Sequence, residues 1–137
     1  MGLQPQLLDV RKPEDLERAF EAAIMQGANM LVVSIDALTQ AHRRPIVDLT
    51  AKHRLPAMYP SREFVDAGGL MAYGVIYTYQ YYRAASFVHK IFNGTKPADL
   101  PVEQPMRFEL VLNLKTAKAL GLTIPPALLF QATEVIQ

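Results

Sequence analysis

The chain has 137 residues, of which half are apolar and a fifth are charged, and its formal net charge is +1. This composition is typical of one globular domain and excludes a disordered chain, while the charge gives no reason to expect nucleic acid or an anionic membrane as a partner. The absence of cysteine excludes disulfides and thiolate chemistry, and no apolar run reaches the roughly 20 residues of a membrane span.

The first elements along the chain are predicted to be a strand, a helix and a second strand. Residues 3–10 form a short apolar segment and are a strand candidate. The helix that follows begins around Pro13, because proline and acidic residues suit a first helical turn, and it ends at Gly27. Residues 29–36 form a continuous apolar run, which indicates a strand covered on both faces.

Pro45 interrupts the next segment of helical periodicity. Since proline lacks the N–H that a helix interior needs, we expect the regular helix to begin near residues 42–44, after an irregular lead-in. Residues 55–60 are another short buried strand. Ser61 is then the predicted N-cap of one or two helical turns that stop at a Gly-Gly pair, and residues 70–74 form a further strand.

A longer helix is predicted over residues 77–93, and four of its first six positions are tyrosines. A proline-rich loop follows over residues 95–105, and residues 106–114 alternate as a strand does. The remaining residues are predicted to form two short terminal helices, the second with Pro125-Pro126 at its start.

This alternation of strands with helices predicts an α/β domain with a doubly wound, mainly parallel sheet and helices on both faces. In such sheets ligands bind beyond the carboxyl ends of the strands. That rule selects four ligand-binding candidates, Asp36, Tyr59, Ser61 and Tyr73, with Glu63 at the same predicted edge. Asp36 and Ser61 could instead be only helix N-caps, Glu63 only a first-turn acid, and the two tyrosines only packing at the sheet end.

No motif of a known catalytic site occurs in the sequence. It contains no GxSxG, no GxxxxGK[ST] and no GxGxxG. The three histidines, His42, His53 and His89, lie too far apart to indicate a zinc motif. We therefore expect no catalysis, no cofactor and no metal.

Three segments in the right order carry a resemblance to a known family. Residues 41–74 ("AHRRPIVDLTAKHRLPAMYPSREFVDAGGLMAYG"), 96–105 ("KPADLPVEQP") and 108–129 ("FELVLNLKTAKALGLTIPPALL") resemble the carboxyl-terminal portion of ABC transporter substrate-binding proteins of the tryptophan/tyrosine-binding-like group. The resemblance implies one lobe of a type I periplasmic binding protein fold. It also implies a solute receptor, whose two lobes close on a small organic ligand and deliver it to a membrane permease.

The chain departs from that group in two ways. It looks like less than half of such a receptor, with residues 1–74 as the lobe core, 75–94 as a helix that lies on the other lobe in relatives, and 95–137 as the returning strand and terminal helices. Many relatives also carry Pro-Asp, Pro-Asn or Leu-Asp where this chain has Val75-Ile76.

The helix over residues 77–93 would then have no partner within the chain. An apolar helix face of that size exceeds what monomers usually expose, so self-association is expected, for example by exchange of the helix. The alternative is that the helix folds back on its own sheet.

Two functions follow from these observations. The first is the solute-binding component, or a fragment of it, of an ABC-type uptake system, with an aromatic amino acid or a related acid as ligand and an ABC permease as partner. The alternative is an oligomeric α/β interaction domain, derived from such a receptor, that no longer binds solute. The resemblance implies a periplasmic or extracytoplasmic location. "MGLQPQLLDV" has neither the basic nor the apolar region of a signal peptide, which predicts a cytoplasmic location if the chain is a complete product.

Overall fold

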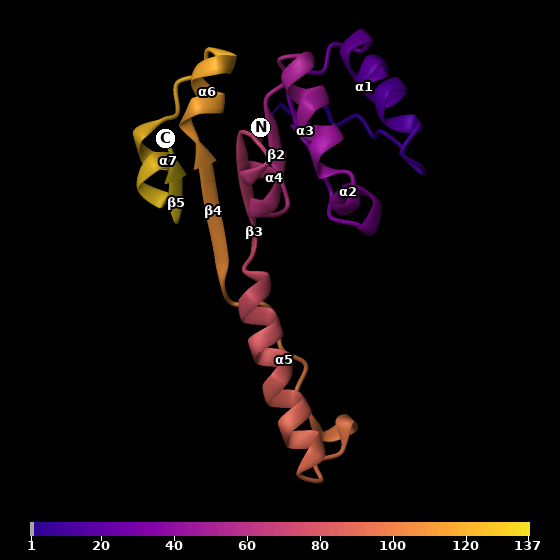
Figure 1. Ribbon diagram of the computed structural model, residues 1–137, viewed down its shortest axis with the longest axis vertical. Helices are drawn as coiled ribbons and strands as arrows, with labels where there is room; N and C mark the ends of the chain where they lie inside the picture. Colours follow the sequence, from indigo (N-terminus) through magenta and orange to yellow (C-terminus); the bar gives the residue numbers. More distant parts are fainter. Residues whose placement is uncertain (1) are drawn as a thin grey trace.

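The computed structural model describes residues 2–137, and Figure 1 shows two parts, a sheet with its helices and a long helical projection. The helices are α1 (Asp15–Met25), α2 (Ala37–Ala41), α3 (Arg43–Lys52), α4 (Arg62–Asp66), α5 (Tyr77–Phe92), a 3-10 turn at Pro97–Asp99, α6 (Leu114–Leu120) and α7 (Pro126–Gln131). The strands are β1 (Leu31–Val32), β2 (Ala57–Tyr59), β3 (Met71–Val75), β4 (Phe108–Asn113) and β5 (Glu134–Ile136).

The five strands form one sheet in the order β1-β2-β3-β4-β5. β1, β2 and β3 run parallel, and so do β4 and β5, whereas β3 and β4 are antiparallel. The antiparallel pair arises because the chain leaves the sheet along β3, turns around beyond α5 and comes back along β4 (Figure 1). The predicted α/β class with a mainly parallel sheet is confirmed.

The core lies on one face of this sheet, under α3 and α4, with α1 packed beyond α3. Side chains alternate between the two faces of a strand, so Tyr59 and its neighbour Ala72 on β3 share the core face. Phe64 of α4 is fully buried there and stacks on Tyr59, with ring centroids 4.9 Å apart. A buried Phe–Tyr pair of this kind contributes about 0.5–1.5 kcal/mol beyond the area that it buries.

The opposite face is open between β1 and β4. Val32, Tyr73 and Phe108 project from it and remain 58%, 52% and 48% exposed. Tyr73 and Phe108 stack on one another with centroids 5.7 Å apart. Nearer the far edge of the sheet, Leu112 is buried, and α6 contacts β5.

Residues 3–10 form no strand, so that prediction is wrong. Pro5 lacks an N–H donor for a ladder, and among the described residues β1 is an edge strand that pairs with β2 alone. The segment instead lies along the surface, where the Gln6 amide donates to Gln26 O at 3.2 Å.

Two further local predictions are corrected. The lead-in to α3 is not irregular, because residues 37–41 form the short helix α2; Pro45 does lie in the first turn of α3, as expected. The last predicted helix ends at Gln131, and residues 134–136 form β5. Thr133 fixes this strand, since its N–H donates to Leu110 O at 2.8 Å and its Oγ1 accepts from Leu110 N at 3.1 Å.

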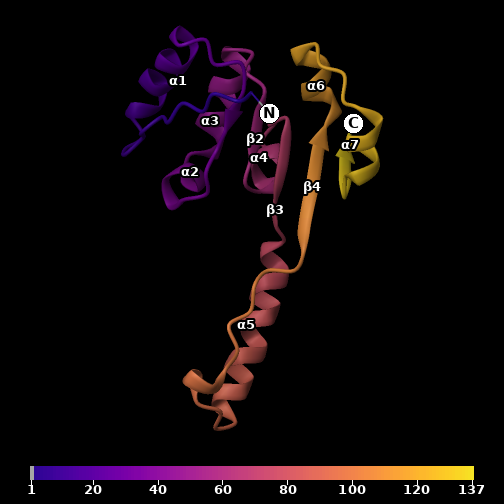
Figure 2. The same cartoon turned by 180° about the vertical axis from the view of Figure 1, so that it is seen from behind.

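The arm, defined as α5 with the returning segment 93–107, extends away from the sheet in both views (Figures 1 and 2). None of the sixteen residues of α5 is buried. The returning segment is held along the helix by the Arg83–Glu103 ion pair at 2.6 Å and by Arg107, whose guanidinium lies 4.2 Å from the centroid of the Tyr79 ring. The alternative in which this helix folds back on its own sheet is therefore wrong. Over residues 2–137 no helix has the length and apolarity that crossing a membrane requires.

Candidate functional site

A groove lies at the carboxyl edge of the parallel strands, where the arm leaves the sheet. This sheet-edge groove has a volume of about 460 Å³, and its lining comes from the start of α2 (Ile35, Asp36, Ala37, Gln40), from α4 (Glu63) and from the first turns of α5 (Tyr77, Tyr81). Its place agrees with the general rule for ligand crevices in open α/β sheets.

Asp36 lines this groove and also caps α2. Its Oδ1 accepts from Thr39 N at 2.9 Å, and Thr39 Oγ1 accepts from Asp36 N at 3.1 Å, which is a reciprocal capping box. Thr39 Oγ1 is also 2.9 Å from Ser34 O, so the end of β1 and the start of α2 are tied together. The carboxylate is thus held at the edge, and Oδ2 accepts no hydrogen bond from residues 2–137.

Ser61 is at the N-cap position of α4, but its side chain makes no capping bond. It is buried, and its Oγ lies 3.4 Å from the Gln40 side-chain amide, which lines the groove. Ser61 therefore lies beneath the groove, where it can orient Gln40, and it does not reach the groove surface itself.

Tyr59 lies in the core and not at the groove. Only 1% of its surface is exposed, and its hydroxyl forms a 2.8 Å hydrogen bond with Thr50 Oγ1. Burial raises the pKa of Tyr59 to about 12, an effect that the bond to Thr50 partly offsets. The side chain that was predicted to face a ligand therefore stabilises the packing between β2 and α3.

A Tyr59→Phe variant is expected to lose about 1 kcal/mol of unfolding free energy, because one buried hydrogen bond disappears while Thr50 Oγ1 keeps its 2.7 Å bond to Val47 O. Urea denaturation at pH 7 measures this loss. The pKa is higher in the folded chain than the ordinary 10.0, so the wild type also loses stability as pH rises from about 10 towards about 12. The variant should not show this alkaline loss of unfolding free energy. A variant whose stability falls as steeply as that of the wild type over the same pH range would contradict the role given to Tyr59.

Tyr73 lies on the open face of the sheet, opposite the core face that carries α4. It is half-exposed and stacks on Phe108, away from the lining of the sheet-edge groove. Of the four candidates, the structure thus brings Asp36 and, through Gln40, Ser61 to one place, and Glu63, which was predicted at the same edge, lines the groove as well. Asp36, Tyr59, Ser61 and Tyr73 do not share one surface, because neighbouring side chains along a strand point to opposite faces.

Sequence reasoning did not select Gln40, Tyr77 and Tyr81 for this groove. Gln40 follows Asp36 by one helical turn, a spacing that places both on one face of α2 once that helix is recognised. Tyr77 and Tyr81 are also one turn apart, and both line the groove from the base of α5. The rest of this helix extends away from the sheet (Figure 1).

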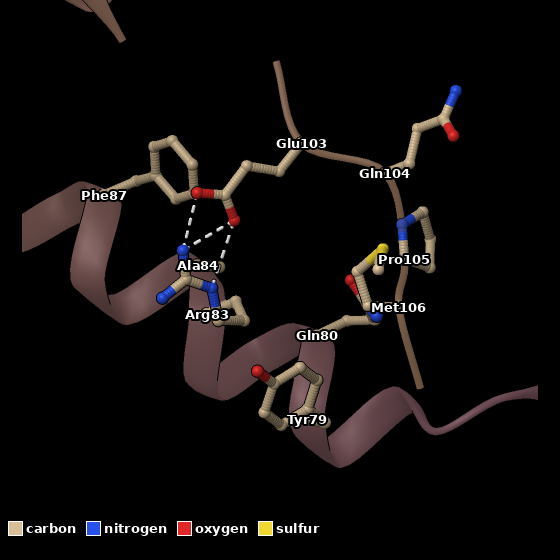
Figure 3. A pocket seen from close by; sticks show the side chains of 9 residues that line it. All are labelled: Tyr79, Gln80, Arg83, Ala84, Phe87, Glu103, Gln104, Pro105 and Met106. Carbon is tan, nitrogen blue, oxygen red and sulfur yellow. Dashed lines mark hydrogen bonds and ion pairs between the residues drawn. The ribbon is translucent and has the colours of Figure 1, made fainter. Parts of the chain in front are cut away.

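A second groove lies along the arm between α5 and the returning segment (Figure 3). This arm groove has a volume of about 410 Å³. Its charged groups are already paired, since both carboxylate oxygens of Glu103 face Arg83, as the dashed lines in Figure 3 mark. Within residues 2–137 no cluster of three or more potential metal ligands occurs in either groove or elsewhere. The sheet-edge groove is the better candidate because neither of its two carboxylates forms an ion pair with another of the residues 2–137.

The fold is a mixed α/β sheet with a groove at the carboxyl edge of its parallel strands, and sequence comparison gives the family. Residues 1–136 match the model of the ABC transporter substrate binding protein family. The chain belongs to this family, which is defined by substrate binding and not by catalysis. No curated protein is similar enough in sequence to count as a match.

Solved structures share the fold. A conserved domain protein from Vibrio cholerae O1 biovar El Tor is 25% identical with a TM-score of 0.83, over 90% of this chain and 42% of that one. An ABC domain from Streptococcus pneumonia in complex with L-Trp is 24% identical with a TM-score of 0.89, over 98% and 46%. A ligand-free, open substrate-binding protein with adhesive properties from Clostridium difficile is 20% identical with a TM-score of 0.63, over 93% and 42%. The chain thus spans less than half the length of each.

Proposed function

We propose that this chain is the solute-binding component of an ABC-type uptake system, or a portion of one, and that it binds a small organic ligand at the sheet-edge groove. The observation that carries the proposal is the groove itself, which lies at the carboxyl edge of the parallel strands and holds aromatic and polar side chains together. Membership of the substrate-binding family supports the same role.

The ligand that we propose is an aromatic amino acid or a related small molecule. The tyrosine rings at the base of α5 offer flat apolar surface, and a protein of the same fold is known in complex with L-Trp. In this proposal Asp36 contacts the ligand, and Ser61 orients Gln40 from beneath the groove. Tyr59 and Tyr73 lie on the two faces of the sheet and do not contact the ligand. We also propose an ABC permease as partner and a periplasmic or extracytoplasmic location, and membership of the family supports both.

Titration calorimetry of the full chain with L-Trp, L-Tyr and L-Phe tests the proposal. We expect saturable heat with at least one of them, and we expect Tyr81→Ala to weaken it by about tenfold, because one aromatic wall disappears. Tyr81 is 76% exposed, so this change should leave the melting temperature unaltered. Val102→Ala, at a fully exposed apolar position outside the groove, is the control and should bind like wild type. No heat and no melting shift with any aromatic ligand would count against a working site.

A second function is favoured by the arm. α5 has no buried residue, and Tyr82 and Phe92 are 73% and 85% exposed. An oligomeric interaction domain that no longer binds solute would explain this surface and the presence of Val75-Ile76 after the crossing strand. Such a domain would self-associate through α5 and give no heat with ligand, whereas a receptor would give heat that depends on Tyr81.

A further inference from the structure

The sheet-edge groove carries two negative charges without a partner. Asp36 and Glu63 both line it, and neither forms an ion pair within residues 2–137. Asp36 uses one carboxylate oxygen to cap α2, which leaves the other for a ligand. Glu63 comes from a different helix, so two elements contribute negative charge to one cavity.

The arginines close in sequence to Asp36 and Glu63 form contacts outside the groove. Arg43 donates to the main-chain oxygen of Gln40 at 3.2 Å and does not line the groove. Arg62 precedes Glu63, but its guanidinium is directed to the core face of the sheet, towards Asp66, Glu134 and Glu109. No lysine or arginine is therefore part of the groove lining, and this half of the site has nothing that would balance a ligand carboxylate.

Aromatic rings complete the lining. Tyr77 and Tyr81 extend from the first turns of α5 over the same cavity. A ring face attracts an organic cation, and this attraction adds to that of nearby carboxylates. Two carboxylates beside two tyrosine rings attract an ammonium group and repel an anion.

We infer that the ligand presents a positively charged amine to this groove, with Asp36 and Glu63 as the groups that select it. The inference rests on the proposed solute-binding function and narrows it, because it favours amino acids and aromatic amines over aromatic acids that lack an amine. Any carboxylate of the ligand would then have to be neutralised outside this lobe.

Three probes that share a phenylethyl group and differ in the charged or neutral group at its end test the inference. The 137-residue chain, labelled with ¹⁵N, is titrated at pH 7 with 2-phenylethylamine, 2-phenylethanol and 3-phenylpropionate, which are cationic, neutral and anionic. We expect the amine to bind at least about tenfold more tightly than the alcohol, with shifts in the amides of α2 and the first turn of α5, and the acid to bind most weakly. Equal affinity for amine and alcohol, or tighter binding of the acid, would overturn the inference.

Variants that remove one charge from the groove provide a second test. Glu63→Gln and Asp36→Asn should each weaken amine binding by about tenfold and leave alcohol binding unchanged, and asparagine preserves the cap of α2. Glu21→Gln, which removes one charge from an exposed position on α1, is the matched control and should bind like wild type. If aromatic amino acids bind without any response to the two groove variants, the ammonium inference fails and the solute-binding function stands. If no probe and no amino acid binds, the proposed function fails as well.

Discussion

A Gly74→Ala variant is expected to lose about 3 kcal/mol of unfolding free energy, at the upper end of what overpacking usually costs. A Cβ at this position would overlap the main-chain oxygen of Pro60, at the point where β3 passes the end of β2. Backbone cannot rotate away as a side chain can, and the adjacent Tyr59–Ala72 pairing holds the two strands together. The thermal midpoint should fall by roughly 10 °C, and differential scanning calorimetry measures the change.

Gly94→Ala separates this steric effect from ordinary glycine strain. Gly94 has φ of 96° at the end of α5, and a Cβ there would meet nothing within 4 Å. Its replacement should therefore cost only about 1 kcal/mol of conformational strain. If Gly74→Ala is no more destabilising than Gly94→Ala, the close approach of β3 to Pro60 does not constrain the fold.

The helices and central strands could be predicted from sequence because their signals are local. Pro13 and Gly27 bound α1, the apolar run after Gly27 contains β1, and the spacing of apolar residues after Pro45 identifies α3. The end of the chain could not be predicted in the same way. Thr-Glu-Val-Ile has the β-branched character of a strand, but what makes it β5 is the pairing of Thr133 with Leu110, a contact 23 residues away in sequence.

The candidate site was predicted less well than the fold. The rule of the carboxyl edge locates Asp36, but it does not say which side chains beyond each strand face the edge. Tyr59 and Tyr73 show the difficulty, because one is buried under α4 and the other lies on the opposite face. Tyr77 and Tyr81 could not be placed from sequence at all. Their position depends on the direction in which α5 leaves the sheet at the end of β3 (Figure 2), and no local sequence pattern encodes that direction.

The full chain is expected to self-associate at micromolar concentration through α5. Val88 and Phe92 are four residues apart, so they lie on one face of the helix, and both are at least 50% exposed. Burying about 100 Å² of each at ~25 cal/mol/Å² would contribute several kcal/mol for each helix in the interface. Size-exclusion chromatography with light scattering should show a mass above that of a 15.3 kDa monomer.

A Val88→Glu, Phe92→Glu double variant should then elute as a monomer, because two like charges on each copy would meet at the interface and lose their hydration. Both positions lie outside the sheet-edge groove, so ligand binding should survive in this variant if the chain is a receptor. The matched control is Leu7→Glu with Met25→Glu, which places two acids at apolar positions that are 97% and 87% exposed and belong to other parts of the fold. Association is expected to persist in this control. A wild-type chain that is already monomeric, or a control variant that dissociates equally, would mean that α5 is not the contact surface. If the Val88→Glu, Phe92→Glu variant still associates but gives no heat with ligand, the arm contributes to the binding site instead.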